Sequence, residues 1–279
     1  MNMIIEYPIT ACGRYTRVLD VGTGPREIWL VHDFGGRADD WRRCMEPLAA
    51  SGYRVRAFDL VGHGFASGYD GFDFTMAGYS NFVRDVLLDN IETGTATVIG
   101  AGLGGQPALR AAWDLVCSDW GEPSVDAFVL CEPSVLEELT PRARVELATR
   151  IARPGRPSLR ARLGTPAGVS PEDLDAMVEE QLHMATSPGR AMALTRIARM
   201  IRYGAEEHPP RRWLAELAER IPTLQIWGAH EGTQPMTRPR PTPTPSGTLP
   251  YLRDPETFAQ TIRTFLSKYT EPDLLPRAG

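Results

Sequence analysis

An alternation of apolar runs with amphipathic segments fills the first 133 residues and constrains the fold more than any other feature. Four apolar runs are typical of buried strands: 26–34, 53–60, 95–100 and 125–133. Three segments between them carry apolar residues at helical spacing: 38–52, 75–91 and 105–120. Strands that alternate with helices predict a sheet whose parallel strands are joined by crossover helices. The sequence therefore predicts an α/β fold.

A glycine-rich turn lies between the third apolar run and the helix that follows it. The segment TVIGAGLGGQPAL, residues 97–109, has the pattern of a strand, a tight turn and a helix. Pro107 falls in the first turn of that helix, where its missing N–H is tolerated. Small residues suit such a turn because the backbone is crowded where a strand bends sharply into a helix. The centre of the turn is Gly102, which has no side chain.

The pattern changes after the fourth strand. Successive helical segments bounded by Pro, Gly or Ser follow: 141–152, 170–185 and 189–204. A strand pattern returns at 222–228, and the chain closes with a capped amphipathic helix at 254–269. This organisation predicts three parts, listed in chain order: a first part of an α/β core (1–133), a helical cap (134–212) and a second part of the core (213–279).

Charge and composition exclude several classes of function. The formal net charge is -5, and Lys268 is the only lysine, so a nucleic-acid partner is not expected. No apolar run reaches the roughly 18–20 residues of a membrane span, and the first residues lack a signal-peptide pattern. We therefore expect a cytoplasmic protein with no membrane partner. The four cysteines are scattered without a nearby histidine, which predicts neither a metal site nor disulfides, and no cofactor is expected: Cys12, Cys44, Cys117 and Cys131.

Five segments, in this order, resemble the α/β-hydrolase fold superfamily over nearly the whole chain. They are LVHDFGGRADDW (30–41), FDLVGHGFASG (58–68), VIGAGLGG (98–105), PTLQIWGAHEG (222–232) and SGTLPYLRDPETF (246–258). The resemblance implies a mostly parallel central sheet flanked by helices, with an inserted helical cap. The segment 234–247 contains five prolines, so any strand there is expected to be short and at the sheet edge. We therefore expect a shortened C-terminal sheet edge.

Two positions of the catalytic triad that the resemblance implies hold residues unable to do that chemistry. Gly102 stands at the nucleophile position and Thr248 at the histidine position, while Glu231 stands at the acid position. Acyl transfer needs a nucleophile beside a base that a third group orients. The resemblance also implies that the backbone N–H groups of Phe34 and Leu103 form an oxyanion hole, which survives the loss of side chains.

Asp33 stands where members of the superfamily usually have glycine, so it adds a carboxylate at the rim of the implied pocket. Partial burial would raise its pKa toward values useful for acid–base catalysis. The alternative is that Asp33 only serves its own turn. Its neighbour His32 is a second catalytic candidate, with structural hydrogen bonding as the alternative. His63, in a Gly-His-Gly turn, is interpreted as a turn residue.

Further candidates follow the later strands. His230 and Glu231 come after the strand at 222–228, where the active sites of open α/β sheets gather. Both are catalytic candidates, with a structural ion pair as the alternative for Glu231. Glu132, after the fourth strand, is predicted to contact substrate, with capping of the next turn as the alternative. Gly102 and Thr248 are also predicted to lie against the substrate.

These features lead to a hypothesis of a cofactor-free, non-hydrolytic enzyme of the lyase, cyclase or isomerase type. The expected substrate is an apolar, polyketide-like carbonyl compound of bacterial specialised metabolism, because cap methionines and aromatic residues would roof the pocket. A ligand-binding or accessory pseudoenzyme is the first alternative, and a hydrolase with an unconventional nucleophile is the second. The arginine-rich stretch 149–162 is interpreted as a solvated face, with docking of a phosphate or of a carrier or pathway protein as the other interpretation.

Overall fold

The molecule is built on one twisted sheet. The structure, a computed structural model, describes the following residues: 3–67, 70–118, 124–132, 140–204, 210–228, 242–244 and 249–269. Within them, eight strands form a single sheet in the order β1-β2-β4-β3-β5-β6-β7-β8. Strand β2 runs antiparallel to both of its neighbours, and the strands from β4 to β8 pair in parallel. The predicted α/β fold with a mostly parallel sheet is confirmed.

The strands have the following bounds: β1 Ile5–Ala11, β2 Arg14–Val21, β3 Arg26–Val31, β4 Tyr53–Phe58, β5 Thr95–Ala101, β6 Ser124–Cys131, β7 Thr223–Gly228 and β8 Thr242–Thr244. The central strands are almost wholly buried because helices cover both faces of the sheet. Strand β8 has only three residues and pairs with β7 alone. The expectation of a short edge strand in the proline-rich segment is confirmed.

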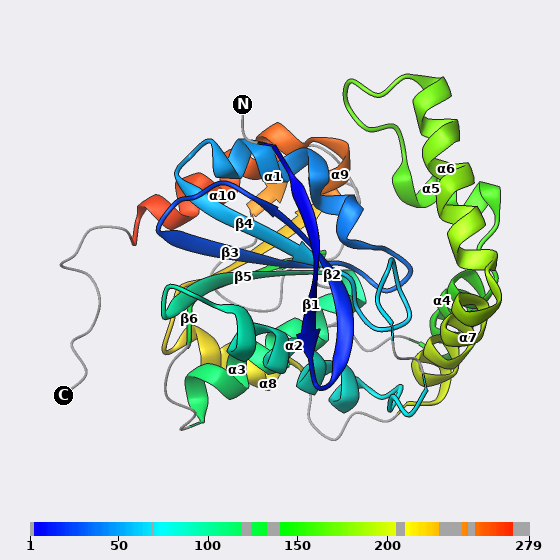
Figure 1. The fold of residues 1–279 in the computed structure, drawn as a ribbon, viewed down its shortest axis with the longest axis horizontal. Coiled ribbons are helices and arrows are strands. Elements are labelled where there is room, and N and C mark those ends of the chain that lie inside the picture. Colours follow the sequence, from blue (N-terminus) through cyan, green and yellow to red (C-terminus); the bar gives the residue numbers. More distant parts are fainter. Residues whose placement is uncertain are drawn as a thin grey trace.

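Two layers of helices cover the sheet (Figure 1). On one face lie α1 (Arg42–Ala49), α9 (Pro250–Arg253) and α10 (Pro255–Ser267); on the other lie α2 (Met76–Asn90), α3 (Gly105–Cys117) and α8 (Pro210–Ala218). The expected caps are present. Thr75 accepts a hydrogen bond from the N–H of Gly78 at 3.0 Å, and Asp254 accepts one from Thr257 at 3.1 Å. Such caps satisfy N–H groups that a helix leaves without a partner.

Four helices between β6 and β7 form a separate layer beside the end of the sheet (Figure 1). They are α4 (Pro141–Ala152), α5 (Arg156–Leu163), α6 (Pro171–Thr186) and α7 (Pro188–Tyr203). We call α4 to α7 the cap. The predicted boundary at 133/134 lies outside the described residues, and the one at 212/213 falls inside α8. That helix packs on α3, where the Trp113 indole N–H donates to Glu216 at 2.8 Å.

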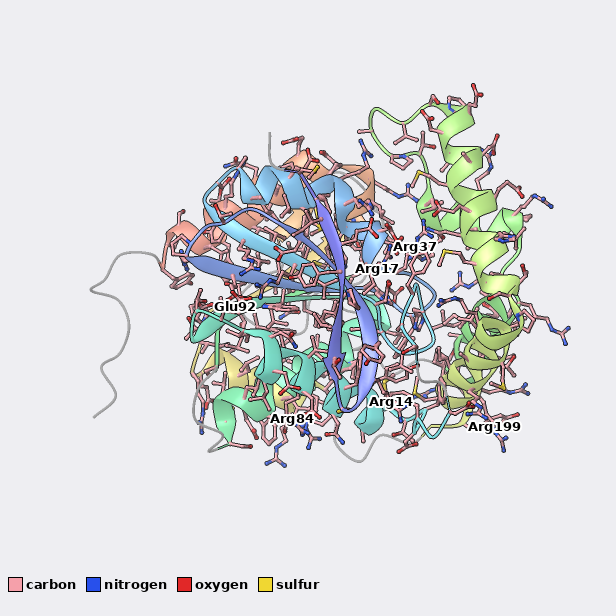
Figure 2. The ribbon with its side chains drawn as sticks, in the orientation of Figure 1. Arg14, Arg17, Arg37, Arg84, Glu92 and Arg199 are labelled. Atoms are coloured by element: carbon pink, nitrogen blue, oxygen red, sulfur yellow. The ribbon has the colours of Figure 1, made fainter. Side chains whose placement is uncertain are left out.

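Polar contacts hold the cap on the core through the loop after β3. The Asp40 carboxylate is buried and accepts hydrogen bonds from Arg162 of α5 and from Gln181 of α6. Arg37, labelled in Figure 2, forms an ion pair with Glu180 of α6 at 2.9 Å. The Arg162–Asp40 pair is largely buried, and a buried ion pair is costly to break, so this contact in particular fixes the cap over the ends of β3 and β5.

None of the described helices is both long enough and apolar enough to cross a bilayer.

Candidate functional site

The turn after β5 has a backbone conformation that favours glycine. Gly102 has a φ of +53°, in the left-handed region, and begins a short 3-10 turn that leads into α3. The crowding expected from the sequence is present at Gly100 as well, where an added Cβ would lie 2.8 Å from the Cα of Gly105. The chain therefore has the sharp strand-to-helix turn that the sequence predicts at this position.

The carboxylate of Asp33 lies against this turn. The N–H of Leu103 donates to Oδ1 of Asp33 at 2.8 Å, and the N–H of Gly104 lies 3.4 Å from the same oxygen. A Cβ built on Gly102 would lie only 2.3 Å from Cγ of Asp33. The Asp33 carboxylate thus fills the space that a side chain at position 102 would need.

A side chain of the protein itself, Asp33, binds at the oxyanion hole that the resemblance implies. The sequence predicts that Phe34 and Leu103 present their N–H groups to a substrate oxygen. In the structure the Leu103 N–H bonds to Asp33 instead. Adjacent backbone N–H groups at a helix N-terminus favour a negative group. The N–H groups at this turn therefore position a carboxylate. They can bind a substrate oxygen only after that carboxylate has moved away.

Opposing influences act on the protonation of Asp33. Burial raises the pKa of the carboxyl above its ordinary value, because it disfavours the charged form. The Arg162 charge and the hydrogen bond from Leu103 act in the opposite direction without cancelling this rise. A carboxylate with a raised pKa is a stronger base than an exposed aspartate.

The raised pKa predicts how Asp33→Asn changes stability with pH. Because the folded state favours the neutral form, ionised Asp33 destabilises the protein at neutral pH. We expect Asp33→Asn to raise the Tm at pH 7 by about 2–4 °C, as ~1 kcal/mol does in a protein of this size. This advantage should disappear as the pH falls toward the ordinary pKa of aspartate, where wild-type Asp33 becomes protonated. Thermal unfolding of both proteins between pH 4 and 8 measures it; a lower Tm for the variant at pH 7 would contradict the prediction.

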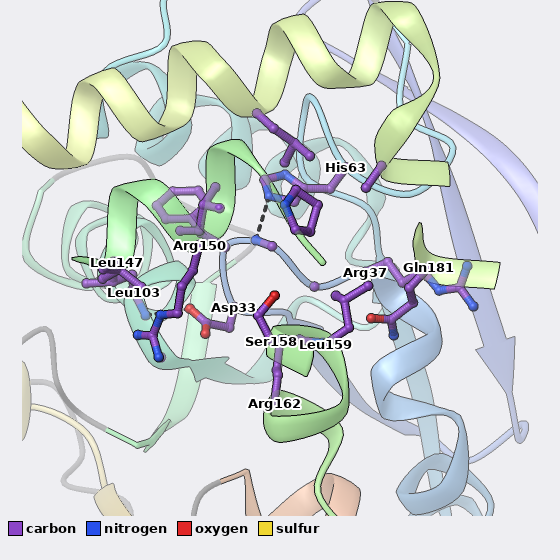
Figure 3. A pocket seen from close by; sticks show the side chains of 18 of the residues that line it. Asp33, Arg37, His63, Leu103, Leu147, Arg150, Ser158, Leu159, Arg162 and Gln181 are labelled. Atoms are coloured by element: carbon purple, nitrogen blue, oxygen red, sulfur yellow. Dashed lines mark hydrogen bonds between the residues drawn. The ribbon is translucent and has the colours of Figure 1, made fainter. Parts of the chain in front are cut away.

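Both histidines near the turn form hydrogen bonds with backbone groups. The N–H of Leu60 donates to Nε2 of His32 at 2.9 Å, and Nδ1 of His32 lies 2.8 Å from the carbonyl oxygen of Asp33. His63 accepts the N–H of Gly35 at Nε2, 3.0 Å away (Figure 3). Burial lowers the pKa of each imidazole, so both are neutral. This geometry fits the structural alternative for His32 and the interpretation of His63 as a turn residue.

Glu132 places a second carboxylate beside the turn. It directly follows β6, is 5% exposed and lines the same cavity as Asp33. Its φ of +51° is unusual for a residue with a side chain, and its N–H donates to the carbonyl oxygen of Ile226 at 2.8 Å. Because β5 lies between β3 and β6, Asp33 and Glu132 flank Gly102 from the two neighbouring strands.

A cavity of about 850 Å³ opens above these residues, between the strand ends and the cap (Figure 3). This volume suits a drug-sized molecule. Its apolar lining includes Phe34, Leu103, Leu147, Ile151, Leu159, Met184, Leu194 and Leu249. Its charged lining consists of Asp33, Glu132, Glu146, Arg37, Arg150, Arg162 and Arg190. An amphipathic ligand fits this mixture best.

Three of the predicted site residues, His230, Glu231 and Thr248, lie outside the described residues. Of the others, Asp33, Phe34, Gly102, Leu103 and Glu132 line the cavity, whereas His32 is fully buried and does not line it.

Sequence reasoning missed two arginines of the site. The stretch 149–162 was expected to be a solvated face, yet Arg150 and Arg162 both line the cavity, and the Arg162 side chain is only 17% exposed. For Arg162 the expectation is wrong, because α5 turns it inward to Asp40. A signal was present: Leu159 and Leu163, one helical turn apart, mark the buried face of α5.

The chain resembles known proteins in both sequence and structure. It is 36% identical over 101 residues to a dihydrolipoyllysine-residue acetyltransferase component of an acetoin cleaving system from Cupriavidus necator, covering 36% of this chain and 25% of that protein. It is 31% identical over 109 residues to an epoxide hydrolase from Caballeronia sordidicola, covering 38% and 32%. Both matches thus span a third or less of those relatives.

A solved serine hydrolase involved in carbazole degradation superposes with a TM-score of 0.69 at 22% identity, covering 95% of this chain and all of that one. At this identity the likeness shows a shared fold. Residues 30–271 match the alpha/beta hydrolase family, which is most of the chain. Together with the sheet order and the turn at Gly102, this match shows that the chain belongs to the alpha/beta hydrolase family.

Proposed function

We propose that this protein is a non-hydrolytic member of its family that moves protons on a carbonyl compound, as lyases, cyclases and isomerases do. The observation that carries the proposal is the Asp33 carboxylate on the Leu103 N–H, in the space above Gly102. A base stands where a hydrolase of this fold holds its nucleophile. Thr248 at the histidine position supports the same reading of a triad that has lost its acyl-transfer chemistry.

In the proposed mechanism Asp33 is the general base. An Asp33 oxygen takes a proton from the carbon next to the substrate carbonyl; the C–H bond breaks, an O–H bond forms, and the electron pair moves onto the carbonyl oxygen. Asp33 becomes neutral, so its hydrogen bonds to Leu103 and Gly104 weaken. The same N–H groups then stabilise the enolate oxygen, as oxyanion holes do. The negative charge thus moves from the Asp33 carboxylate to the substrate oxygen, and the same N–H groups stabilise it in both places.

The enolate can then react in ways that the cavity permits. Glu132, on the other side of Gly102, is placed to exchange a proton at a second position of the substrate. Return of the proton to another carbon gives isomerisation, and attack of the enolate carbon on a second carbonyl gives cyclisation. The apolar lining from Leu147, Ile151 and Leu159 excludes water from these steps.

Proton exchange into deuterated water tests the proposal. Benzylacetone, an apolar ketone, serves as the probe, and ¹H NMR follows the loss of its α-protons. We expect the protein to speed this exchange above the buffer rate, with neither labelling by serine-directed phosphonates nor turnover of simple esters. Ester turnover that persists through independent purifications, or absence of catalysed exchange, would refute it.

A second candidate function is ligand binding without catalysis. The hydrogen bonds that Asp33 already forms with the backbone N–H groups favour it. Because Asp33 already occupies the N–H groups of Leu103 and Gly104, the cavity could hold a ligand whose carbonyl they never reach. Benzylacetone binding without any exchange would support this candidate.

A further inference from the structure

We infer that the substrate carries a carboxylate and that Arg150 of α4 binds it. This inference rests on the proposed function, for which it specifies the substrate as an acid with an apolar body.

Arg150 is a cation without a partner in the described part of the chain. It makes no hydrogen bond, ion pair or ring contact there, although most of the cavity's other charged groups are engaged. Arg37 pairs with Asp39 and Glu180, and Arg162 pairs with Asp40. Arg150 is an exposed residue at a cavity with both apolar and charged lining. An unpaired guanidinium in that position is a site for a planar anion, since its donor fork matches a carboxylate.

The helix could have neutralised Arg150 with a residue of its own. Glu146 lies four residues earlier, which is the favourable order for an acid and a base on one helix face. Glu146 instead accepts a hydrogen bond from Arg142 at 2.9 Å. Both Glu146 and Arg150 line the cavity. Because Glu146 pairs with Arg142, it leaves the positive charge of Arg150 without a counter-ion on this helix.

Figure 3 shows Arg150 and Asp33 both pointing into the cavity, from α4 and from the loop after β3. No ion pair joins them, so their charged groups are more than 4.0 Å apart. A carboxylate on Arg150 would place the rest of the substrate between the cap and the turn at Gly102.

Arg162 adds further hydrogen-bond donors to the cavity. Its Nη2 is held by Asp40, whereas its Nε and Nη1 are buried and have no hydrogen-bond partner in the described residues. Buried donors without acceptors are uncommon and call for a ligand group or an ordered water nearby. Although its charge is paired with Asp40, Arg162 thus has donors left for an anion near the proposed base, in addition to Arg150.

The apolar lining defines the remainder of the substrate. Leu147 and Ile151 lie on α4, as Arg150 does, and Leu159 lines the same cavity from α5. An acid with an aromatic or aliphatic body would place its head on Arg150 and bury its body among these side chains. A neutral analogue of the same shape keeps the apolar contacts and loses only the charged hydrogen bonds.

Calorimetric titration with benzoylpropionate and with its primary amide tests the inference. The two probes have the same shape and differ in charge. We expect the wild type to bind the acid roughly tenfold or more tightly than the amide, equivalent to about 1.4 kcal/mol. Arg150→Gln should remove this preference. Arg199→Gln should keep it, because Arg199 is exposed as Arg150 is but lies on α7 and does not line the cavity (Figure 2).

Equal affinity of the wild type for acid and amide, or the same loss in both arginine variants, would overturn the inference. The two proposals fail separately. If Asp33→Asn abolishes proton exchange on benzylacetone but Arg150→Gln leaves acid binding intact, only the carboxylate site is refuted. If Arg150→Gln weakens acid binding but proton exchange does not depend on Asp33, the carboxylate site at Arg150 is supported and the role of Asp33 as the base is refuted.

Discussion

Replacing Asp33 by glycine should lower the rate of α-proton exchange on benzylacetone by roughly 10²–10⁴-fold, the usual contribution of a general base. The reason is direct: no other carboxylate in the described residues bonds to the N–H groups of Leu103 and Gly104. The substitution also leaves a space the size of a carboxyl group in front of those donors. Added formate should enter this space and recover about 10- to 100-fold of the lost rate.

The size and charge of the added ion provide the controls. Acetate is larger than the vacated space and should restore less, and chloride should restore nothing because it cannot take up a proton. The recovery should saturate with formate concentration, since it depends on binding. A variant that exchanges protons at the wild-type rate without formate would contradict the assignment of Asp33 as the base.

Gly102→Ala should destabilise the protein by about 3 kcal/mol. The φ of +53° costs a residue with a Cβ ~1–2 kcal/mol, and the new methyl group would lie 2.3 Å from Cγ of Asp33. Overpacking of this kind adds ~1–3 kcal/mol, because the carboxylate must leave its hydrogen bonds. Urea unfolding of the variant measures the loss.

A double-mutant cycle separates the two causes. In the Asp33→Gly background the steric cost vanishes, so Gly102→Ala should then cost only ~1–2 kcal/mol. The difference between the two backgrounds measures the contact between positions 33 and 102. Additive effects, with no coupling between the two substitutions, would show that the Asp33 carboxylate does not occupy this space.

Much of the fold could be predicted from the sequence because its core elements have strong periodic signals. The segments 75–91 and 254–269 show helical spacing and begin at a capping residue, and the structure starts α2 and α10 there. The hairpin of β1 and β2 was not predicted. Its turn is formed by Cys12 and Gly13, both with positive φ, and cysteine at such a position is not a usual turn signal.

The candidate site was predicted only in part. Residues that follow strands, such as Asp33 and Glu132, can be assigned to one edge of a sheet because parallel strands end together. The direction in which Asp33 points could not be predicted, since it depends on the absence of a Cβ at Gly102, which is far away in the sequence. The inward placement of Arg162 depends on Asp40, which contacts it only once the cap is packed on the core. Contacts of this kind have no periodic signal.

The most direct test of the central claim is a crystal structure of the protein at neutral pH, refined at a resolution that defines the Asp33 carboxylate. We expect one carboxylate oxygen at about the 2.8 Å from the Leu103 nitrogen seen here, with the space above Gly102 filled by that group. An Asp33 side chain turned into the open cavity, with water on the N–H groups of Leu103 and Gly104, would contradict the claim.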